Sequence, residues 1–337
     1  MLLFKRNILL SLLIIFSFSS CSNTTKSEEK PQKKIEKWVE GAEFNADSAY
    51  KFIVNQVNYG PRVPNTSNHE KCGDWLVSKL ENMGCQVSEQ KGEVIAFNGA
   101  KLPVRNIIGN LNPNSKTKVL LCAHWDTRPF ADRDSNNINQ PIIGANDGAS
   151  GVGVLLEIAR VFAKDSLELG LEIIFFDVED YGAPNYNSSF FDLNSMNDTW
   201  CLGSQFWCYN LDANYQKPKF GILLDMVGAK NAVFPKEEIS RQYSGYHLNK
   251  IWKLGDYLGY GKYFKKKIAP PLTDDHTYIN KLAQIPTLDI IHYDISPFTN
   301  RYDFGRFHHT HQDNLDIIEI KTLKAVGQTV LTYLYNI

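Results

Sequence analysis

The chain has 337 residues, with 36 Lys and Arg residues against 37 Asp and Glu residues and a formal net charge of −1. This balance, without a long basic stripe, argues against nucleic-acid binding, which needs clustered Lys and Arg to neutralise phosphates. Apolar residues make up 43% of the chain, which is enough to build the core of a single large α/β domain.

The first 20 residues are typical of a secretion signal. Lys5 and Arg6 precede an apolar run over residues 8–18, which is too short to span a membrane comfortably. Cys21 follows two serines and resembles the lipidated cysteine of a bacterial lipoprotein. The alternative is an ordinary signal peptide followed by an incidental cysteine. We expect export to the bacterial periplasm or cell envelope, with membrane contact only through a lipid on Cys21.

The region after Cys21 has a different composition. Residues 22–37 contain almost no apolar side chains and cannot bury enough surface to offset the entropy of ordering. We therefore expect residues 21–40 to be the lipidated cysteine and a flexible tether, and residues 41–337 to form one catalytic domain.

Hydrophobic periodicity predicts alternating helices and strands along this domain. In chain order, the pattern predicts helices over 45–57 and 67–83, strands over 102–111 and 118–123, a helix over 148–163, strands over 171–176 and 221–224, a helix over 246–258, a strand over 285–291 and a helix over 317–335. Ser67 and Glu70 are spaced as a capping box at the start of the second helix. This alternation predicts an α/β fold with a mixed, mostly parallel central sheet flanked by helices.

Acidic and histidine residues follow the predicted strands, at the edge where parallel sheets carry their ligands. They are His124, Asp147, Glu179, Asp180, Asp225, Asp274, His308, His309 and His311. Each alone has a simpler explanation, such as a helix cap, a solvated loop or a surface cluster. Together, carboxylates crowded at one edge would repel one another unless a cation neutralised them. Imidazole and carboxylates without thiolates suit a catalytic zinc site.

Glu179 and Asp180 are adjacent at the end of one strand. Neighbouring residues that leave a strand point in different directions, so one carboxylate can bind metal while the other stays free. A free carboxylate beside a metal site is suited to general acid and base catalysis.

The five cysteines after Cys21 contain no CxxC pair, so a structural zinc knuckle is not expected. Cys201 and Cys208 are the nearest candidates for a disulfide in an exported protein, although sequence alone leaves this pairing open.

Seven segments resemble the M28 zinc aminopeptidases and the related glutaminyl-peptide cyclotransferases. In family order they are AHWDT, GANDGASGVGVLLEIAR, FFDVEDYG, LLDMVG, DDHTYI, ISPF and HHTHQDNLD. The resemblance covers the chain from about residue 55 to its end. It implies the zinc aminopeptidase fold, which is similar to that of the phosphorylases and hydrolases.

The resemblance also implies roles for individual residues. Asp147, Asp180 and His309 match the metal ligands, and Glu179 matches the catalytic glutamate. Two further positions, His124 and Asp225, match the residues that hold a second metal in the two-zinc aminopeptidases, and Asp274 matches a cyclase residue that forms hydrogen bonds near the reacting groups.

Several segments are closer to the cyclases than to typical aminopeptidases. They are LLDMVGAKNAVF, SPF and WCLGSQFW, the last of which resembles the bacterial cyclases. Two departures from the animal cyclases are Asp289, where those enzymes have a His, and His308, where they have a Trp. Phe298, Trp200 and Trp207 are candidates for an apolar wall of the substrate pocket, and core packing is an equal alternative for Trp207.

The expected function is conversion of N-terminal glutamine in peptides or proteins to pyroglutamate with release of ammonia. One zinc ion is expected, with Glu179 carrying the proton and Asp225 and Asp274 orienting Glu179 or the substrate. The first alternative is an aminopeptidase with two zinc ions, and the second is a lipoprotein that binds peptides without catalysis. We expect a monomer whose partners are peptide or protein N-termini, without nucleic acid.

Overall fold

The computed structural model describes residues 37–165, 167–184 and 198–337, and residues from Trp38 to Ile337 form one compact unit. The predicted signal segment and Cys21 lie outside the described residues. Within the described ranges, no helix has both the length and the apolar character required to cross a bilayer.

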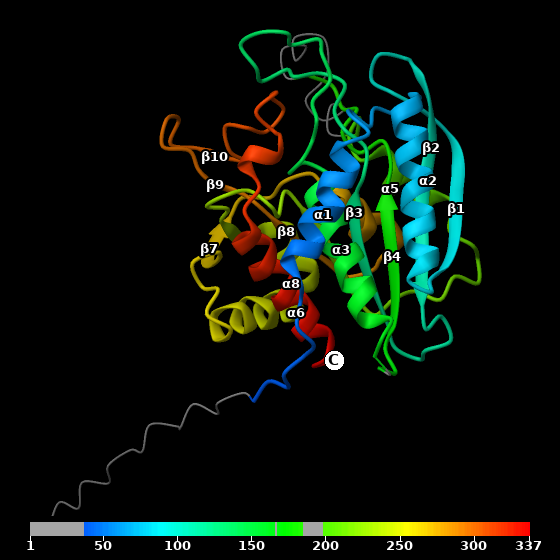
Figure 1. Ribbon diagram of the computed structural model, residues 1–337, viewed down its shortest axis with the longest axis vertical. Helices are drawn as coiled ribbons and strands as arrows, with labels where there is room; N and C mark the ends of the chain where they lie inside the picture. The colour runs from blue at the N-terminus through cyan, green and yellow to red at the C-terminus, as the bar shows by residue number, and fades with distance from the viewer. Residues whose placement is uncertain (1–36, 166, 185–197) are drawn as a thin grey trace, which may run out of the picture. The chain divides into compact units, whose positions relative to one another are not determined.

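A six-stranded sheet forms the centre of this unit, in the order β1-β2-β4-β3-β5-β8 (Figure 1). The strands are β1 (Gln86–Ile95), β2 (Lys101–Leu111), β3 (Lys118–His124), β4 (Gly170–Phe176), β5 (Gly221–Asp225) and β8 (Thr287–Ile291). β4, β3, β5 and β8 run parallel to one another, whereas β2 is antiparallel to both β1 and β4. This sheet confirms the predicted mixed, mostly parallel α/β fold.

Helices cover both faces of the sheet because side chains alternate between the faces along each buried strand. On β3, Leu121 and Ala123 face the larger core, while Leu120 and Cys122 face a second core on the opposite side. The helices that supply residues to the larger core are α1 (Ala46–Val57), α2 (Ser67–Asn82), α3 (Ala149–Phe162), α6 (Glu238–Tyr257) and α8 (Ile320–Leu334). The second core is closed by α5 (Leu202–Tyr209) and the π-helical turn Ile279–Ala283, which follows the short α7 (Asp275–Tyr278).

Helix α3 packs against the sheet and against α1 (Figure 1). A Cβ atom on Gly151 would lie 2.1 Å from the carbonyl oxygen of Leu224, and one on Gly153 would lie 2.7 Å from Ile53 Cγ1. Side chains at these two positions would therefore push α3 away from β5 and α1. The residues that precede α3 and those that end β5 are brought together by this packing.

Several elements differ from those predicted by sequence. Thr66, not Ser67, caps α2 by accepting a hydrogen bond from His69 N at 3.3 Å. Helix α6 begins at Glu238, two turns before the predicted start, because a polar first segment continues through a kink at Ser244. The edge strand β1 was not predicted because its polar sequence lacks an apolar face and is held by pairing with β2.

The remaining short elements lie outside the central sheet. They are β6 (Phe234–Glu237) paired with β7 (Phe264–Ala269), β9 (Asp294–Ile295) paired with β10 (Tyr302–Asp303), and the 3₁₀ turn Leu315–Ile317. The predicted strand over 285–291 begins at Thr287, and the last helix begins at Ile320 rather than residue 317. All five cysteines of the described ranges are buried free thiols, so Cys201 and Cys208 form no disulfide in this structure.

Candidate active site and metal centre

The carboxyl ends of the parallel strands bring together the three predicted metal ligands. Asp147 lies just before α3, Asp180 follows β4, and His309 lies in the loop before α8. His309 Nε2 is 3.2 Å from Asp180 Oδ1 and 3.8 Å from Asp147 Oδ2. All three residues are buried, so charge at this point is poorly hydrated.

The donor atoms of this group fit a divalent cation. Within the described parts of the chain, Asp147 Oδ2 and both carboxylate oxygens of Asp180 are buried without a hydrogen-bond partner. Burial and the nearby charge of Asp147 raise the pKa of Asp180 above its usual range. Buried carboxylates of this kind are costly unless a cation compensates them, and two carboxylates with an imidazole suit Zn²⁺.

His308 lies beside this group and differs from His309 in its surroundings. Its Nε2 is 3.8 Å from Asp147 Oδ2, and its Nδ1 faces Arg133 Nη1 at 2.7 Å. Burial lowers the pKa of His308 well below its usual value, and the charges of His309 and Arg133 act in the same direction. A neutral His308 accepts the Arg133 hydrogen bond. His311, the third histidine of the segment, instead pairs with Asp134 at 2.8 Å on the surface.

His124 lies at the end of β3 and contacts three carboxylates. Its Nε2 is 3.0 Å from Asp147 Oδ1 and 3.3 Å from Asp225 Oδ1, and its Nδ1 is 3.4 Å from Asp126 Oδ1. Burial opposes protonation of His124, but the hydrogen bonds to these carboxylates raise its pKa well above the usual value. Burial also raises the pKa of Asp225, to about 7. The two predicted second-metal residues are therefore adjacent to Asp147.

Glu179 occupies the turn after β4 and faces a different set of groups from Asp180. Its Oε1 lies 3.1 Å from Cys201 Sγ, and its Oε2 lies 4.0 Å from His124 Nδ1. Burial raises the pKa of Glu179 well above its usual range, and the charges of Asp180 and Asp274 add to this effect against the opposing charge of His124. A carboxyl with a raised pKa keeps its proton to a higher pH than an ordinary glutamate, which suits it to general acid and base catalysis.

Asp126 fixes the main chain of the turn that carries Glu179. Its Oδ1 accepts a hydrogen bond from Glu179 N at 3.1 Å, and its Oδ2 accepts one from Asp180 N at 3.2 Å. Val178, the residue before Glu179, has a left-handed φ of 51°. Sequence analysis did not identify Asp126 as a site residue, although it lies two residues after His124 at the same strand end.

Arg128 is a second residue that sequence analysis missed. Its guanidinium is fully buried, pairs with Asp132 at 2.6 Å and donates to the carbonyl oxygen of Asp180 at 3.0 Å. It also lies 4.6 Å from the ring of Trp200, which stacks on His309 with 5.7 Å between ring centroids. Arg128 and Trp200 thereby hold the main chain of one metal-ligand candidate and the ring of another.

A group of buried acids lies beside Glu179. Asp274 Oδ1 accepts from Asp275 N at 2.6 Å at the start of α7. Asp289, on β8, has ligand atoms within 4.8 Å of those of Asp274 and His276. Burial raises the pKa of Asp274, and burial with the charge of Asp274 raises the pKa of Asp289 well above its usual range. The two carboxyls thus lie close together in a buried site, and His276 Nε2 lies 3.1 Å from Glu237 Oε1.

A cavity of about 430 Å³ opens onto these residues. Its lining includes the predicted Asp147, Glu179, Asp180, Trp200, Asp225, Asp274 and His309, together with the aromatic residues Tyr293, Tyr302 and Phe304. Carboxyl groups and aromatic rings thus line the same small cavity.

Two predicted pocket residues do not line this cavity. Trp207 is 2% exposed and packs edge-on against Phe176 in the second core, so the core-packing alternative describes it. Phe298 is 82% exposed and borders a neighbouring hollow of about 720 Å³. Nothing in the sequence SPF indicates that the ring of Phe298 lies at the surface.

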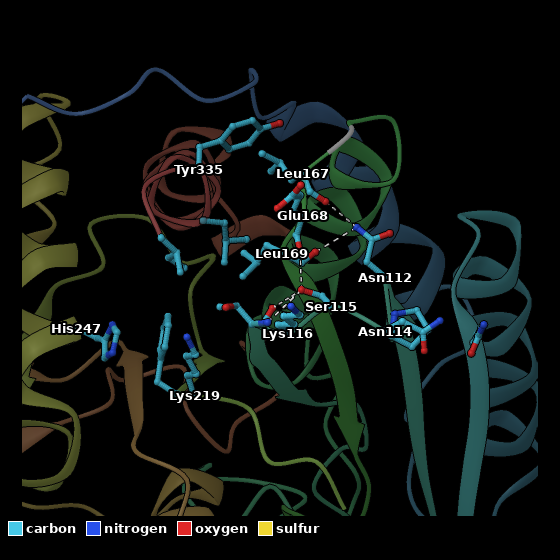
Figure 2. A pocket seen from close by; sticks show the side chains of 16 residues that line it. Asn112, Asn114, Ser115, Lys116, Leu167, Glu168, Leu169, Lys219, His247 and Tyr335 are labelled. Carbon is cyan, nitrogen blue, oxygen red and sulfur yellow. Dashed lines mark hydrogen bonds between the residues drawn. The ribbon is translucent and has the colours of Figure 1, made fainter.

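A larger hollow, of about 960 Å³, lies at the opposite edge of the sheet, where the parallel strands begin (Figure 2). Its lining includes Lys116, Lys219, His247 and Tyr335. None of the predicted catalytic or metal-binding residues lines it. The volume of a cavity therefore does not identify the candidate active site in this fold. Its position at the carboxyl ends of the parallel strands does.

Comparison with known proteins gives consistent relatives. The sequence profile of peptidase family M28 matches residues 106–334. A glutaminyl cyclase from Bacteroides thetaiotaomicron, whose crystal structure has N-acetylhistamine bound, is 49% identical with a TM-score of 0.82, covering 88% of this chain and 100% of that one. A Zn-dependent exopeptidase from Parabacteroides distasonis is 46% identical with a TM-score of 0.83, covering 88% and 99% of the two chains.

A curated relative is more distant. The glutaminyl-peptide cyclotransferase of Bothrops jararaca is 29% identical over 268 residues, which are 68% of this chain and 65% of that protein. The match thus spans just under two thirds of the curated relative's length.

Proposed function

The chain belongs to peptidase family M28, as its motifs predicted, and we propose that it is a zinc-dependent glutaminyl cyclase acting on the N-termini of peptides or proteins. The observation that carries this proposal is the position of Glu179. Its carboxyl, on a side chain that is 12% exposed, borders the small cavity that is also lined by Asp147, Asp180, His309 and Asp274. The 49% identity to a glutaminyl cyclase over the whole of that chain supports the same activity.

Asp147, Asp180 and His309 would hold one zinc ion in this proposal. Their unpartnered buried oxygens and the nearby imidazole nitrogen are the donor set that zinc takes in catalytic sites. A bound zinc supplies Lewis acidity toward the γ-carbonyl oxygen of the substrate glutamine.

The chain's own residues bind the substrate and move its protons. The α-amine forms a bond to its own γ-carbon and the bond from that carbon to the amide nitrogen breaks, so the products are a lactam and ammonia. Glu179 accepts a proton from the attacking amine and delivers it to the departing nitrogen, which its raised pKa favours. Both reacting groups belong to one residue, so holding that residue folded in a small cavity supplies much of the acceleration.

Asp274 and Asp225 would orient these groups. Ligand atoms of Asp274 and Glu179 lie within 4.8 Å of each other, and Asp225 contacts His124 on the other side of the cavity. Trp200 stacks on His309, and Tyr293 and Phe304 line the same cavity, where the three rings would exclude water that could hydrolyse the amide.

A two-zinc aminopeptidase is the second candidate, and one observation favours it. His124, Asp147 and Asp225 offer ligand atoms within 4.8 Å of one another, and a 46% identical relative is a Zn-dependent exopeptidase. Against it, the segments LLDMVGAKNAVF and WCLGSQFW are closer to the cyclases, and the 49% identical relative is a glutaminyl cyclase.

We further propose that the chain is exported, lipidated at Cys21 and monomeric. Export and lipidation are supported by the composition of the first 37 residues, in which an apolar run, two serines and Cys21 precede a polar segment. Labelling of cells with a radioactive fatty acid should mark the wild-type chain and not Cys21→Ala. Light scattering during gel filtration should give the mass of one chain, and the mass of two would refute the monomer.

Mass spectrometry tests the activity directly. Full-length, zinc-loaded protein is incubated with two peptides that differ only in an N-terminal Gln or Leu. Loss of one ammonia from the Gln peptide, with the Leu peptide unchanged, is the expected result. Release of free N-terminal amino acids would instead establish the aminopeptidase, and two unchanged peptides would refute both activities.

A further inference from the structure

We propose that the Cys201 thiol is a positioning group for Glu179, which donates a hydrogen bond to Oε1 and thereby fixes the direction in which the other carboxyl oxygen faces. This inference rests on the proposed function. It assigns a role to a cysteine that is a buried free thiol in the structure and lies outside the Asp147, Asp180 and His309 group.

The contact is close, and its thiol is buried. Cys201 Sγ lies 3.1 Å from Glu179 Oε1, and Cys201 is 0% exposed. Within the described ranges, the basic side-chain nitrogen nearest to Glu179 Oε2 is His124 Nδ1, at 4.0 Å. The two carboxyl oxygens are therefore in different surroundings, with Oε1 held by the thiol and Oε2 left to exchange a proton.

The main chain places Cys201 beside Glu179 through two residues that have unfavourable backbone conformations. Cys201 N donates to Glu179 O at 2.9 Å, and Leu202 N donates to Val178 O at 3.0 Å. Cys201 and Val178 both have left-handed backbones, with φ of 57° and 51°. Such conformations are rare for residues other than glycine, most of all for a β-branched residue, and they persist only where the surroundings enforce them.

Helix α5 packs tightly against this turn. A Cβ atom on Gly203, two residues after Cys201, would lie 1.9 Å from the carbonyl oxygen of Asp177. The start of α5 thus rests directly on the residues that carry Glu179. The main chain that carries the thiol consequently has a fixed position relative to the turn that carries the carboxyl.

The thiol remains a donor in this environment. Burial raises the pKa of Cys201 well above its usual value, and the charge of Glu179 acts in the same direction. A protonated sulfur has one hydrogen to give, and Glu179 Oε1 is the acceptor at hand. The alternative is that Cys201 only fills space in the core, in which case its sulfur could be replaced without changing turnover.

The test compares three variants in full-length, zinc-loaded protein. Cys201→Ala removes the donor, Cys201→Ser keeps a hydroxyl donor, and Cys208→Ala makes the matched change in the same helix, where the thiol contacts Tyr278 O at 3.7 Å. We expect kcat for the Gln peptide to fall about 5- to 30-fold in Cys201→Ala with KM unchanged, since one hydrogen bond to a charged or buried acceptor is lost. Cys201→Ser should recover part of kcat, and Cys208→Ala should match the wild type.

A Raman measurement tests the contact without relying on activity. The S–H stretching band that disappears in Cys201→Ala should shift toward the frequency of a free thiol in Glu179→Ala. Wild-type kcat in Cys201→Ala, or a band that does not respond to Glu179→Ala, would overturn the proposal. If the wild type releases no ammonia, the proposed function fails, and the Raman shift alone decides the contact.

Discussion

Replacement of Asp126 tests whether one buried carboxylate holds the turn that carries Glu179 and Asp180. Asp126 is 0% exposed and accepts from Glu179 N at 3.1 Å and Asp180 N at 3.2 Å. Asp126→Ala leaves two buried N–H groups without an acceptor, each of which costs about 1–3 kcal/mol. We therefore expect the free energy of unfolding to fall by about 2–6 kcal/mol, a large share of the roughly 5–15 kcal/mol of a typical domain.

Asp126→Asn refines this test because an amide keeps one accepting oxygen. It should lose one of the two hydrogen bonds, so the expected cost is about half, or about 1–3 kcal/mol. Urea titration followed by Trp fluorescence measures both variants at one zinc concentration. Asp47→Ala, at the exposed first turn of α1, is the control and should cost only about 0.3–1 kcal/mol. An Asp126→Ala protein within about 0.5 kcal/mol of the wild type would refute the role assigned to these two bonds.

Three further predictions concern the proton, the metal and the acid stability. Glu179→Gln should lower kcat by about 100- to 10,000-fold while zinc content measured by atomic absorption stays unchanged, and retained turnover would contradict both catalytic candidates. Removing zinc with a chelator should abolish ammonia release and lower the melting temperature, because Asp147, Asp180 and His309 lose the cation that compensates their burial, and added zinc should restore both. Burial and the charge of Lys250 lower the pKa of His247 from 6.5 to about 4, so the stability that its neutral form contributes is complete above pH 6.5 and is lost as the pH falls toward 4. His247→Gln should flatten unfolding free energy against pH in that window, and an unchanged slope would contradict the assignment.

The sheet was predictable because its central strands are buried on both faces. The segment Gly170–Phe176 is apolar except for Glu172, as strands buried on both faces largely are, and the polar residues that follow it had to lie at the sheet edge. The same rule brought Asp180 close to Asp147, which lies before a helix in a different part of the chain. The edge strand Gln86–Ile95 lacks this signal, because its stability comes from pairing with β2 rather than from its own apolar face.

The supporting residues of the site were not predictable in the same way. Asp126 and Arg128 act on main-chain groups of the Glu179 turn, and such contacts depend on loop conformations that no periodicity records. The directions in which the aromatic rings face were also not predictable from the sequence. Trp207 packs in the core and Phe298 lies at the surface, because the rotation of a helix and the path of a loop decide which way each ring faces.

The glycine at position 151 has a consequence beyond packing. A hydrogen atom is all that separates this helical turn from the Leu224 carbonyl, so the helix–strand distance here is at its lower limit. Asp147 is anchored at the start of that helix and Asp225 at the end of that strand. The spacing between two acids of the site is thus set by a residue that touches neither substrate nor ion. Variation among related chains could alter the loops around the cavity freely, whereas even a methyl group at this position would widen the site itself.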